Sequence, residues 1–419
     1  MPRMRTDDSI VIVGAARTPI GAYLGGLKTV PAGELGAIAL NEAIKRAGIK
    51  SEEIEEVIAG QAMGTQEESN IGRVIGLKAG LKKQSTGMTV NRICGSGIQS
   101  AISAAQELMT MDVDFIAAGG VESLSRSEYY LPLESRWEGF KAGNFTVIDA
   151  NLALHKHAQP NPDYPEITHM GDTAEKVAER YAITREEQDT FAVDSQRKAS
   201  SAIERGRLAQ EIVPVEVIGR RKGVITVVDK DEHPRPGTNM ESLARLKPAF
   251  RKDGKGTITA GNASGLNDGA AFEVFTKASV AKERGLDVMA KIVDFAIAGC
   301  DPNVMGLGPV YAINKVLSQN KLTLEDIDIL EINEAFAAQT LGCMKELGID
   351  PGTELYERLN PNGGAIALGH PLGMSGARII TSLCYEFKNH PEKKYAIASA
   401  CIGGGQGIAL LLENGSVNE

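Results

Sequence analysis

Two cysteines far apart in the sequence lie in glycine-lined settings that favour chemistry over core packing. Cys94 stands within residues 91–97 (Asn-Arg-Ile-Cys-Gly-Ser-Gly), and Cys401 is followed by Ile-Gly-Gly-Gly. Between them, residues 363–376 carry one histidine, His370, among glycines that let backbone amides approach a ligand. A nucleophilic thiolate needs a base and an anion-stabilising environment, and carbon-acid chemistry needs a second base on the other side of the substrate. These segments hold a candidate for each role.

Cys94 is the candidate nucleophile because of the elements predicted around it. A strand-like run at 88–91 precedes it, and a helix rich in small residues is predicted over 95–109. On such a strand-to-helix turn, unpaired amides and the helix dipole favour the thiolate over the thiol. The alternative is a buried structural cysteine before a core helix, since free cysteine is among the most buried residue types. That interpretation is given to the cysteines without a glycine-rich frame: Cys300, Cys343 and Cys384.

His370 and Asn333 are the other polar candidates. His370 is flanked by a glycine and a proline, which neither shield it nor continue a helix; a lone histidine is more often structural, but these neighbours favour a catalytic one. Asn333 follows a strand-like apolar run at 327–332, where a satisfied structural asparagine is the alternative. Apart from His169, the remaining histidines are assigned to loops and turns: His155, His157, His233 and His390.

Composition and charge describe an ordinary globular protein and exclude several classes. The 419 residues are 42% hydrophobic and 24% charged, which allows a large core and more than one domain. No apolar run approaches the roughly 20 residues of a membrane helix, and the ends show no signal peptide or peroxisomal address, so we expect a cytoplasmic protein without a membrane partner. The formal net charge of −9 argues against a nucleic-acid partner. Five widely spaced cysteines without a Cys-x-x-Cys pair predict neither a disulfide framework nor a zinc site.

The two ends of the chain read as copies of one pattern. Strand-like residues 9–14 precede a helical stretch at 34–47, and strand-like residues 290–298 precede a helical stretch at 310–318. The repetition predicts two similar α/β halves packed face to face, with a ligand site at their junction.

Between the copies lies a segment of different character. Its residues 151–165, with clustered proline and histidine, predict an exposed loop, and residues 175–205 predict a helix. Basic residues gather in its second part, where a solvated basic face is the plainest interpretation; they are Arg220, Arg221, Lys222, Arg235, Arg245, Lys247, Arg251 and Lys252. The chain is therefore divided into an N-terminal half at 1–123, an inserted domain at 124–266, a return to the N-terminal half at 267–287 and a C-terminal half at 288–419.

Five segments, taken in order, resemble the thiolase family. They are residues 91–97, residues 169–171 (His-Met-Gly), residues 333–337 (Asn-Glu-Ala-Phe-Ala), residues 363–376 and residues 401–407. The similarity covers essentially the whole chain and is nearest to the acetyl-CoA C-acetyltransferase branch. It implies an α/β fold in which duplicated halves form a layered core, with an inserted loop domain that covers coenzyme A. The first part of that domain is similar to the tetramerisation loop of some members.

The resemblance also implies a role for each candidate. Cys94 carries the acetyl group as a thioester, and Cys401 removes a proton from the methyl group of a second acetyl-CoA. His370 takes the Cys94 proton and, with a water held by Asn333, forms one oxyanion hole, while the amides of Cys94 and Gly403 form another. The positions that match coenzyme A contacts are His169, Met170, Arg235, Ser242, Phe250, Ala260, Ser264, Met305 and Phe336. The basic residues belong to the segment that contacts the nucleotide end in this family.

The activity implied is the reversible condensation of two acetyl-CoA to acetoacetyl-CoA and coenzyme A. Neither a metal nor a redox cofactor is expected, coenzyme A being a substrate and product, and the expected assembly is a homotetramer, a dimer of dimers. A longer-chain 3-ketoacyl-CoA thiolase of fatty acid degradation is one alternative. A ketoacyl synthase shares the fold but would pair one cysteine with two histidines. An inactive coenzyme A-binding homologue is disfavoured because every catalytic position of the family is occupied.

Overall fold

One continuous mixed sheet forms the frame of the computed structural model, which describes residues 8–140, 142–219 and 223–416. Across the sheet the strands follow one another as β12 (Ile329–Ile332), β13 (Tyr395–Ile402), β14 (Gln406–Asn414), β11 (Ala290–Gly299), β1 (Ile10–Arg17), β10 (Asn267–Lys277), β5 (Phe115–Ser123), β3 (Glu56–Gly60) and β4 (Thr86–Val90). The two-residue strand β2 (Gly21–Ala22) pairs with β10.

The sheet consists of two halves with the same strand succession. In the N-terminal half β1, β10 and β5 are antiparallel neighbours and β3 is parallel to β5; in the C-terminal half β11, β14 and β13 are antiparallel neighbours and β12 is parallel to β13. The halves join where β1 pairs with β11, through Val11 opposite Lys291 and Ile12 opposite Ala290. The predicted duplication of an α/β unit is confirmed.

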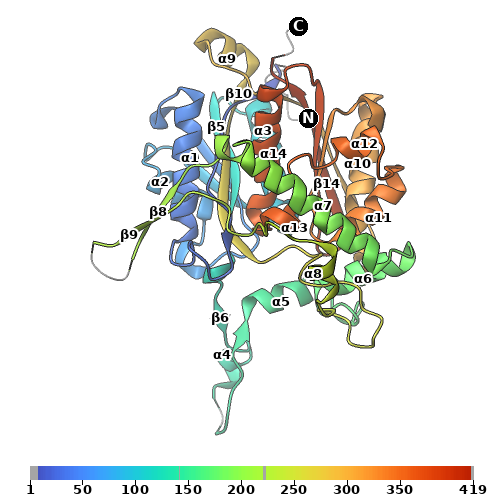
Figure 1. The fold of residues 1–419 in the computed structure, drawn as a ribbon. Helices are drawn as coiled ribbons and strands as arrows, with labels where there is room; N and C mark the ends of the chain where they lie inside the picture. Colours follow the sequence, from blue (N-terminus) through green and yellow to red (C-terminus); the bar gives the residue numbers. More distant parts are fainter. Residues whose placement is uncertain (1–7, 141, 220–222, 417–419) are drawn as a thin grey trace.

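Helices form the layers on either side of these strands (Figure 1). Helices α3 (Ser96–Thr110) and α14 (Leu372–Asn389) lie at the centre, in contact with each other and with strands of both halves. Helices α1 (Ala32–Ala47) and α2 (Ile71–Lys78) cover the outer face of the N-terminal half, and α10 (Gly308–Asn320) and α11 (Ala337–Leu347) cover that of the C-terminal half. Residues 372–387 of α14 are all buried. Their mostly apolar and small side chains fit a helix that packs against strands of both halves of the sheet.

The two central helices approach each other through glycines near their N-termini. A Cβ atom on Gly97 would lie 2.4 Å from the backbone nitrogen of Ala377, and one on Gly376 would lie 2.5 Å from that of Ile98. Any larger residue would therefore separate the helices. Since Cys94 and His370 each precede one of these helices by two residues, the contact brings both groups to the same place.

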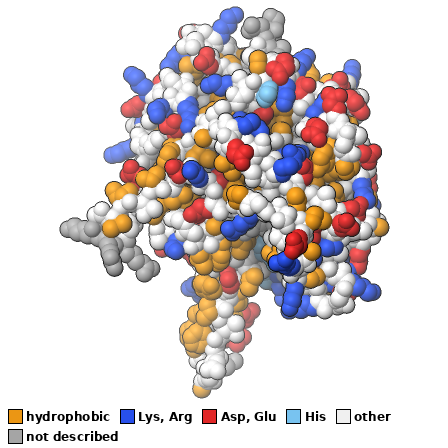
Figure 2. Space-filling view, in the orientation of Figure 1, with side chains coloured by type: hydrophobic (Ala, Val, Ile, Leu, Met, Phe, Trp, Pro, Cys, Tyr) orange, Lys and Arg blue, Asp and Glu red, His pale blue; other side chains and the backbone are white. Residues whose placement is uncertain are grey.

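The inserted segment begins with a protruding arm. It contains β6 (Tyr129–Tyr130), α4 (Ser135–Glu138) and β7 (Ile148–Asp149), and it extends away from the layered core (Figure 1). Hydrophobic side chains gather along it (Figure 2), and those with at least half of their surface exposed are Tyr129, Leu133, Trp137, Phe140, Phe145 and Val147. An apolar surface of this kind marks an interaction site.

A helix follows the arm where an exposed loop was predicted. Helix α5 (Ala150–Lys156) starts at Asp149, whose carboxylate accepts the Asn151 amide at 2.9 Å. The prediction of a loop over 151–165 is therefore wrong for its first six residues. So short a helix is marginal by itself and is stabilised by the surface on which it packs, which local sequence does not reveal.

The helix predicted over 175–205 is in fact two helices. Helix α6 (Met170–Arg180) ends before Ala182, which has a positive φ of 50°, and α7 (Arg185–Glu204) begins with a capping box between Thr184 and Glu187. A hairpin of β8 (Val215–Ile218) and β9 (Ile225–Val228) and the short helix α8 (Met240–Ala244) follow. The basic residues 220–222 lie outside the described residues.

The remaining elements are short. The helices are α9 (Ala278–Arg284), α12 (Glu354–Arg358) and α13 (Ala365–Leu368). The 3₁₀ turns are η1 (Ser51–Glu53), η2 (Gln66–Glu68), η3 (Ile93–Gly95), η4 (Leu124–Arg126), η5 (Leu208–Gln210), η6 (Pro302–Leu307) and η7 (Leu324–Asp326). Within the described ranges, no helix has both the length and the apolar character needed to cross a bilayer.

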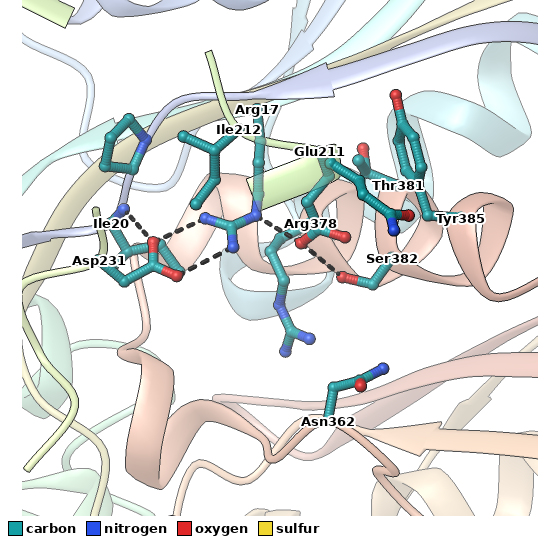
Figure 3. A network of polar contacts seen from close by, with 12 residues as sticks. Arg17, Ile20, Glu211, Ile212, Asp231, Asn362, Arg378, Thr381, Ser382 and Tyr385 are labelled. Atoms are coloured by element: carbon teal, nitrogen blue, oxygen red, sulfur yellow. Dashed lines mark hydrogen bonds and ion pairs between the residues drawn. The ribbon is translucent and has the colours of Figure 1, made fainter. Parts of the chain in front are cut away.

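A buried ionic network joins the inserted segment to the core (Figure 3). Arg17 of β1 donates to Glu211 at 2.6 Å and to Asp231 at 2.7 Å, and Ser382 of α14 donates to Glu211 at 3.1 Å. Burial opposes the ionised form of Glu211, but Arg17 and Arg207 outweigh it and hold the pKa of this carboxyl below its ordinary value. Removal of one partner would leave an uncompensated buried charge, at a cost of about 3–5 kcal/mol.

Candidate active site

The Cys94 turn is held by short hydrogen bonds around a strained backbone. Cys94 lies in η3, between β4 and α3, and is 8% exposed. Its neighbour Ile93 has a positive φ of 46°, and the amide of Ile93 donates to Asn91 Oδ1 at 2.9 Å. The Ser96 hydroxyl accepts from the Arg92 amide at 2.8 Å and donates to the Ile93 carbonyl at 2.7 Å. The thiol is thereby fixed at the start of α3.

His370 precedes α14 and is bound on both sides of its ring. Its Nδ1 lies 2.6 Å from Ser375 Oγ, which itself donates to the Pro371 carbonyl at 2.9 Å. Because the hydroxyl proton is engaged by that carbonyl, Ser375 accepts from Nδ1–H, and Nε2 carries the lone pair. Asn333 Nδ2 approaches Nε2 at 3.4 Å, and the His370 amide donates to Asn267 Oδ1 at 2.9 Å. This tautomer has a proton acceptor at Nε2.

Burial keeps the thiol and the imidazole neutral. It raises the pKa of Cys94 to about 12, and the nearby Glu122 adds to the rise, although the Gly403 amide donates to the sulfur and opposes it. It lowers the pKa of His370 to about 3, with a further contribution from the Arg378 guanidinium. At neutral pH the pair is therefore a thiol and a neutral base, and ionisation of Cys94 requires proton transfer during attack.

Cys401 ends the strand that leads to the glycine turn. It is fully buried at the end of β13, and Gly404 and Gly405, with positive φ of 83° and 85°, complete the turn to β14. A turn of this shape needs residues that tolerate positive φ, which explains the glycines. Burial raises the pKa of the Cys401 thiol well above its ordinary value, and a charge on Cys94 raises it further.

Asn333 lies behind His370, in the turn between β12 and α11. Its amide donates to the Ser399 carbonyl at 2.9 Å. Its side-chain oxygen is buried and has no hydrogen-bond partner among the described residues, so its 3.4 Å contact with His370 is the one polar contact of the carboxamide in that part of the chain. Such an amide is free to bind a further polar group.

The cysteines and the histidine open onto one cavity of about 280 Å³ between the inserted segment and the core. Eleven of the residues predicted for the site line it: Cys94, His169, Met170, Phe250, Ala260, Ser264, Met305, Phe336, His370, Cys401 and Gly403. The wall is largely apolar, and its polar side chains include the imidazoles of His155, His169 and His370. An apolar pocket with a few convergent polar groups is typical of a small-molecule site.

The other three predicted site residues, Asn333, Arg235 and Ser242, are not part of the lining of this cavity. Arg235 borders a separate groove of about 540 Å³ with Arg197, Ser201 and Thr238. The Ser242 hydroxyl donates to a backbone carbonyl of its own helix cap, at 2.7 Å. Part of the basic cluster is also paired, since Arg251 contacts Glu179 and Asp253.

An aromatic wall contains one histidine that sequence reasoning placed elsewhere. His169 stacks on Phe250 with ring centroids 4.6 Å apart, and Phe250 meets Phe336 edge-on at 6.1 Å. On its other side His169 contacts His155 of α5 at 4.1 Å. The assignment of His155 to an exposed loop is therefore wrong, because the docking of α5 turns it into the cavity.

Further polar groups that support the site also escaped the sequence analysis. His233, assigned to a loop, lies 3.4 Å from Asn267 Nδ2, and burial lowers its pKa to about 4. Glu122 accepts amides from Ala62 at 2.9 Å and Gly373 at 2.8 Å, and burial raises its pKa to about 7. One signal was available: a Ser-Gly pair follows both Cys94 and His370, at 96–97 and 375–376.

These features place the chain in a known family. Residues 10–279 match the thiolase N-terminal domain, and residues 286–414 match the thiolase C-terminal domain. The protein belongs to the thiolase family.

Individual relatives narrow the comparison. The acetyl-CoA acetyltransferase of Syntrophomonas wolfei is 45% identical over 404 residues, covering 96% of this chain and 98% of the relative, and that of Cupriavidus necator is 46% identical, covering 96% and 99%. Among solved structures, the Bacillus anthracis acetyl-CoA acetyltransferase superposes with a TM-score of 0.89 at 45% identity, covering 97% and 99%. The human mitochondrial 3-ketoacyl-CoA thiolase in complex with CoA superposes with a TM-score of 0.88 at 38% sequence identity, covering 97% of this chain and 98% of that one.

Proposed function

We propose that the protein is an acyltransferase that reversibly condenses two acetyl-CoA to acetoacetyl-CoA and free coenzyme A. The observation that carries this proposal is the meeting of two cysteines, Cys94 and Cys401, with His370 and the Gly403 amide at one apolar cavity. One cysteine serves as acyl carrier and the other as carbon base. The names of the relatives from Syntrophomonas wolfei, Cupriavidus necator and Bacillus anthracis support acetyl as the acyl group.

In the first half-reaction Cys94 becomes acetylated. Its sulfur attacks the thioester carbonyl of acetyl-CoA while His370 Nε2 takes the thiol proton. The amides of Cys94 and Gly403 stabilise the tetrahedral oxyanion. The bond to the coenzyme sulfur then breaks, His370 returns the proton to that sulfur, and free coenzyme A leaves. The resting neutral pair of thiol and imidazole fits this sequence, because His370 needs its lone pair at Nε2 when attack begins.

In the second half-reaction Cys401 first loses its thiol proton to the solvent, and the resulting thiolate takes a proton from the methyl group of another acetyl-CoA. Acetylation leaves Cys94 without an ionisable proton, so no Cys94 thiolate can form beside Cys401 and raise its pKa further. The enolate oxygen is stabilised by His370 and by a water bound to Asn333. The enolate carbon attacks the acetyl carbonyl, the bond to the Cys94 sulfur breaks, and the proton on Cys401 returns to Cys94.

The substrate path and the assembly are part of the same proposal. The pantetheine arm of coenzyme A lies in the apolar cavity beneath residues 124–266, and its nucleotide end lies towards Ser242, Arg235 and the other basic residues. The protein acts in the cytoplasm without a metal or redox cofactor. The apolar side chains of the protruding arm support a homotetramer, since their burial in an interface would remove them from water.

The test is thiolysis of acetoacetyl-CoA compared with that of a long-chain 3-ketoacyl-CoA by the purified protein. We expect the acetoacetyl substrate to give the larger kcat/KM. A strong preference for the long chain would assign the protein to the degradative branch, and absence of turnover with either would identify a coenzyme A-binding homologue.

A further inference from the structure

Glu334, beside Asn333, is a buried carboxylate that connects three segments. It is 1% exposed. Its Oε2 accepts from the Ser195 hydroxyl of α7 at 2.6 Å and from the Ile366 amide of α13 at 3.3 Å, and its Oε1 accepts from Asn360 Nδ2 at 2.8 Å. One side chain thus joins the inserted segment, the turn at 360 and the one-turn helix α13.

These bonds determine where the His370 segment begins. The Gly364 amide donates to the same Ser195 hydroxyl at 3.2 Å, and a Cβ on Gly364 would lie 2.2 Å from Glu334 Cδ. Helix α13 runs from Ala365 to Leu368, after which Gly369, with a φ of 104°, leads directly into His370. A displacement of Glu334 is therefore expected to shift residues 364–370, which include His370.

Asn333 depends on its surroundings for its orientation. Its carboxamide has the 3.4 Å contact with His370 and a side-chain oxygen without a partner among the described residues. Its backbone amide donates to the Ser399 carbonyl at 2.9 Å, its carbonyl accepts from the Ala335 amide at 3.0 Å, and Glu334 is the residue between these two. The position of the amide follows from the residues next to it.

Helix α7 has a second link to the same region. Lys198, one turn after Ser195, donates to the Leu359 carbonyl at 2.9 Å and is buried. Residue 359 precedes Asn360, whose carboxamide also bonds the backbone of Ile332 in both directions, at 2.9 and 3.0 Å. The link between α7 and the end of β12 is therefore a built network, and Glu334 is its central acceptor.

We infer that Glu334 is a positioning residue for the enolate step, coupling Asn333 and His370 to helix α7 of the inserted segment. It touches neither substrate nor the reacting atoms. Its carboxylate fixes the distance between the Asn333 amide and the imidazole, and so the pocket for the enolate oxygen. The inference rests on the proposed condensing activity.

Glu334→Gln is the discriminating variant, since it keeps the volume but leaves one accepting oxygen for donors that approach from opposite sides. We expect kcat for acetoacetyl-CoA thiolysis to fall by roughly tenfold or more with KM within about twofold. Exchange of acetyl-CoA methyl protons with deuterium should fall at least about fivefold more than acetylation of Cys94, because Asn333 serves the enolate.

A matched control exists in the same core. Glu273 of β10 is fully buried and, among the described residues, its carboxyl accepts from the Thr381 hydroxyl of α14 at 2.7 Å and not from the segments that hold Asn333 and His370. Glu273→Gln should leave the ratio of exchange to acetylation unchanged. If Glu334→Gln behaves like Glu273→Gln, with altered stability and an unaltered ratio, the inference is overturned.

Ser195→Ala keeps the test open should the glutamine variant fold poorly. It should shift the same ratio in the same direction by a smaller factor, and the effect of the Ser195→Ala/Glu334→Gln double variant should fall short of the product of the two single effects, because both single variants disturb the bond between Ser195 and Glu334. Strictly multiplicative effects would contradict the coupling. Wild-type protein without thiolysis would instead contradict the proposed function, so the two failures are distinguishable.

Discussion

The two halves of the molecule share a strand order but not a chemical task. At the centre, α3 of the N-terminal half follows the Cys94 turn and α14 of the C-terminal half follows the His370 turn, and a Ser-Gly pair begins two residues after Cys94 and five residues after His370. In the first turn Ser96 binds backbone groups; in the second Ser375 binds the imidazole.

The comparison shows how one local arrangement, a side chain placed just before a helix N-terminus, can hold a proton donor in one half and a proton acceptor in the other. A helix N-terminus favours negative charge and disfavours positive charge. Placed before α3, a thiol gains help in becoming a thiolate; placed before α14, an imidazole is kept neutral and able to accept a proton. Burial then raises the pKa of Cys94 to about 12 and lowers the pKa of His370 to about 3, so neither group changes its charge near neutral pH.

The largest effect is expected at Cys94, the proposed nucleophile, which the N-terminal half supplies. Cys94→Ala should abolish labelling by acetyl-CoA and lower thiolysis on the order of 10⁴-fold while the fold persists, because the acyl carrier alone is removed. Intact-protein mass measurement detects the acetyl group. Persistent acetylation of the variant would assign the nucleophile to another residue.

Cys401→Ser tests the contribution of the C-terminal half. A serine hydroxyl is a far weaker base than a thiolate, so condensation and deuterium exchange of the acetyl methyl group should fall by about 10³-fold. Acetylation of Cys94 should remain rapid, because Cys401 takes no part in acyl transfer. Exchange at the wild-type rate would remove Cys401 from its role as carbon base.

Substitution of the contact glycine in either central helix should destabilise the fold to a similar extent. Gly97→Ala and Gly376→Ala each place a Cβ within 2.5 Å of a backbone nitrogen of the other helix. Each should lower the free energy of unfolding by about 3 kcal/mol, as overpacking of a core does. Urea denaturation measures the loss; Gly76→Ala, within helix α2 and with no atom closer than 3.3 Å to the added Cβ, controls for a change from glycine to alanine in a helix without a backbone clash.

Ser96 and Ser375, the serines of the two Ser-Gly pairs, provide a matched pair of variants. Ser375→Ala removes the acceptor that fixes the His370 tautomer and should lower the rate of Cys94 acetylation by about tenfold. Ser96→Ala removes bonds within the backbone turn and should act mainly on stability. Acetylation kinetics beside thermal unfolding separate the two outcomes, and equal kinetic losses in both variants would show that Ser375 acts only through the turn.

The pH profile should show the smallest effect. The lowered pKa of His370 leaves its imidazole neutral at every pH well above 3, and the raised pKa of Cys94 leaves its thiol protonated at every pH well below 12. Neither group titrates between pH 6 and 8, and ionisation of Glu122, whose pKa burial raises to about 7, only opposes the Cys94 thiolate, so the rate constant for acetylation at low acetyl-CoA should rise by no more than about twofold there. A tenfold rise centred near pH 7 would contradict the neutral pair.

The parts of the site that sequence predicts are those with local causes. Glycines around Cys94, His370 and Cys401 reflect backbone turns and close approaches that any chain with those turns must satisfy. The duplicated strands and helices follow from hydrophobic patterns of the same local kind. These features could be read without knowledge of the packing.

The parts that sequence missed have tertiary causes. Helix α5 forms because it docks over the cavity, and this docking turns His155 towards His169. The environment of His233 is likewise set by Asn267, 34 residues away. Ser375 and Glu334 act through partners that only the fold brings near, so their residue types alone predict an ordinary helix serine and a solvated acid.

The glycine contact between α3 and α14 has a consequence for substrate entry. Because the two backbones touch without intervening side chains, neither helix can approach the other more closely, and the turns that carry Cys94 and His370 are held at a short separation. The part of the cavity wall that this contact does not hold comes from α5 and the rest of the inserted segment. We therefore expect adjustment to molecules of different length to occur in that segment, while the thiol and the imidazole keep their places.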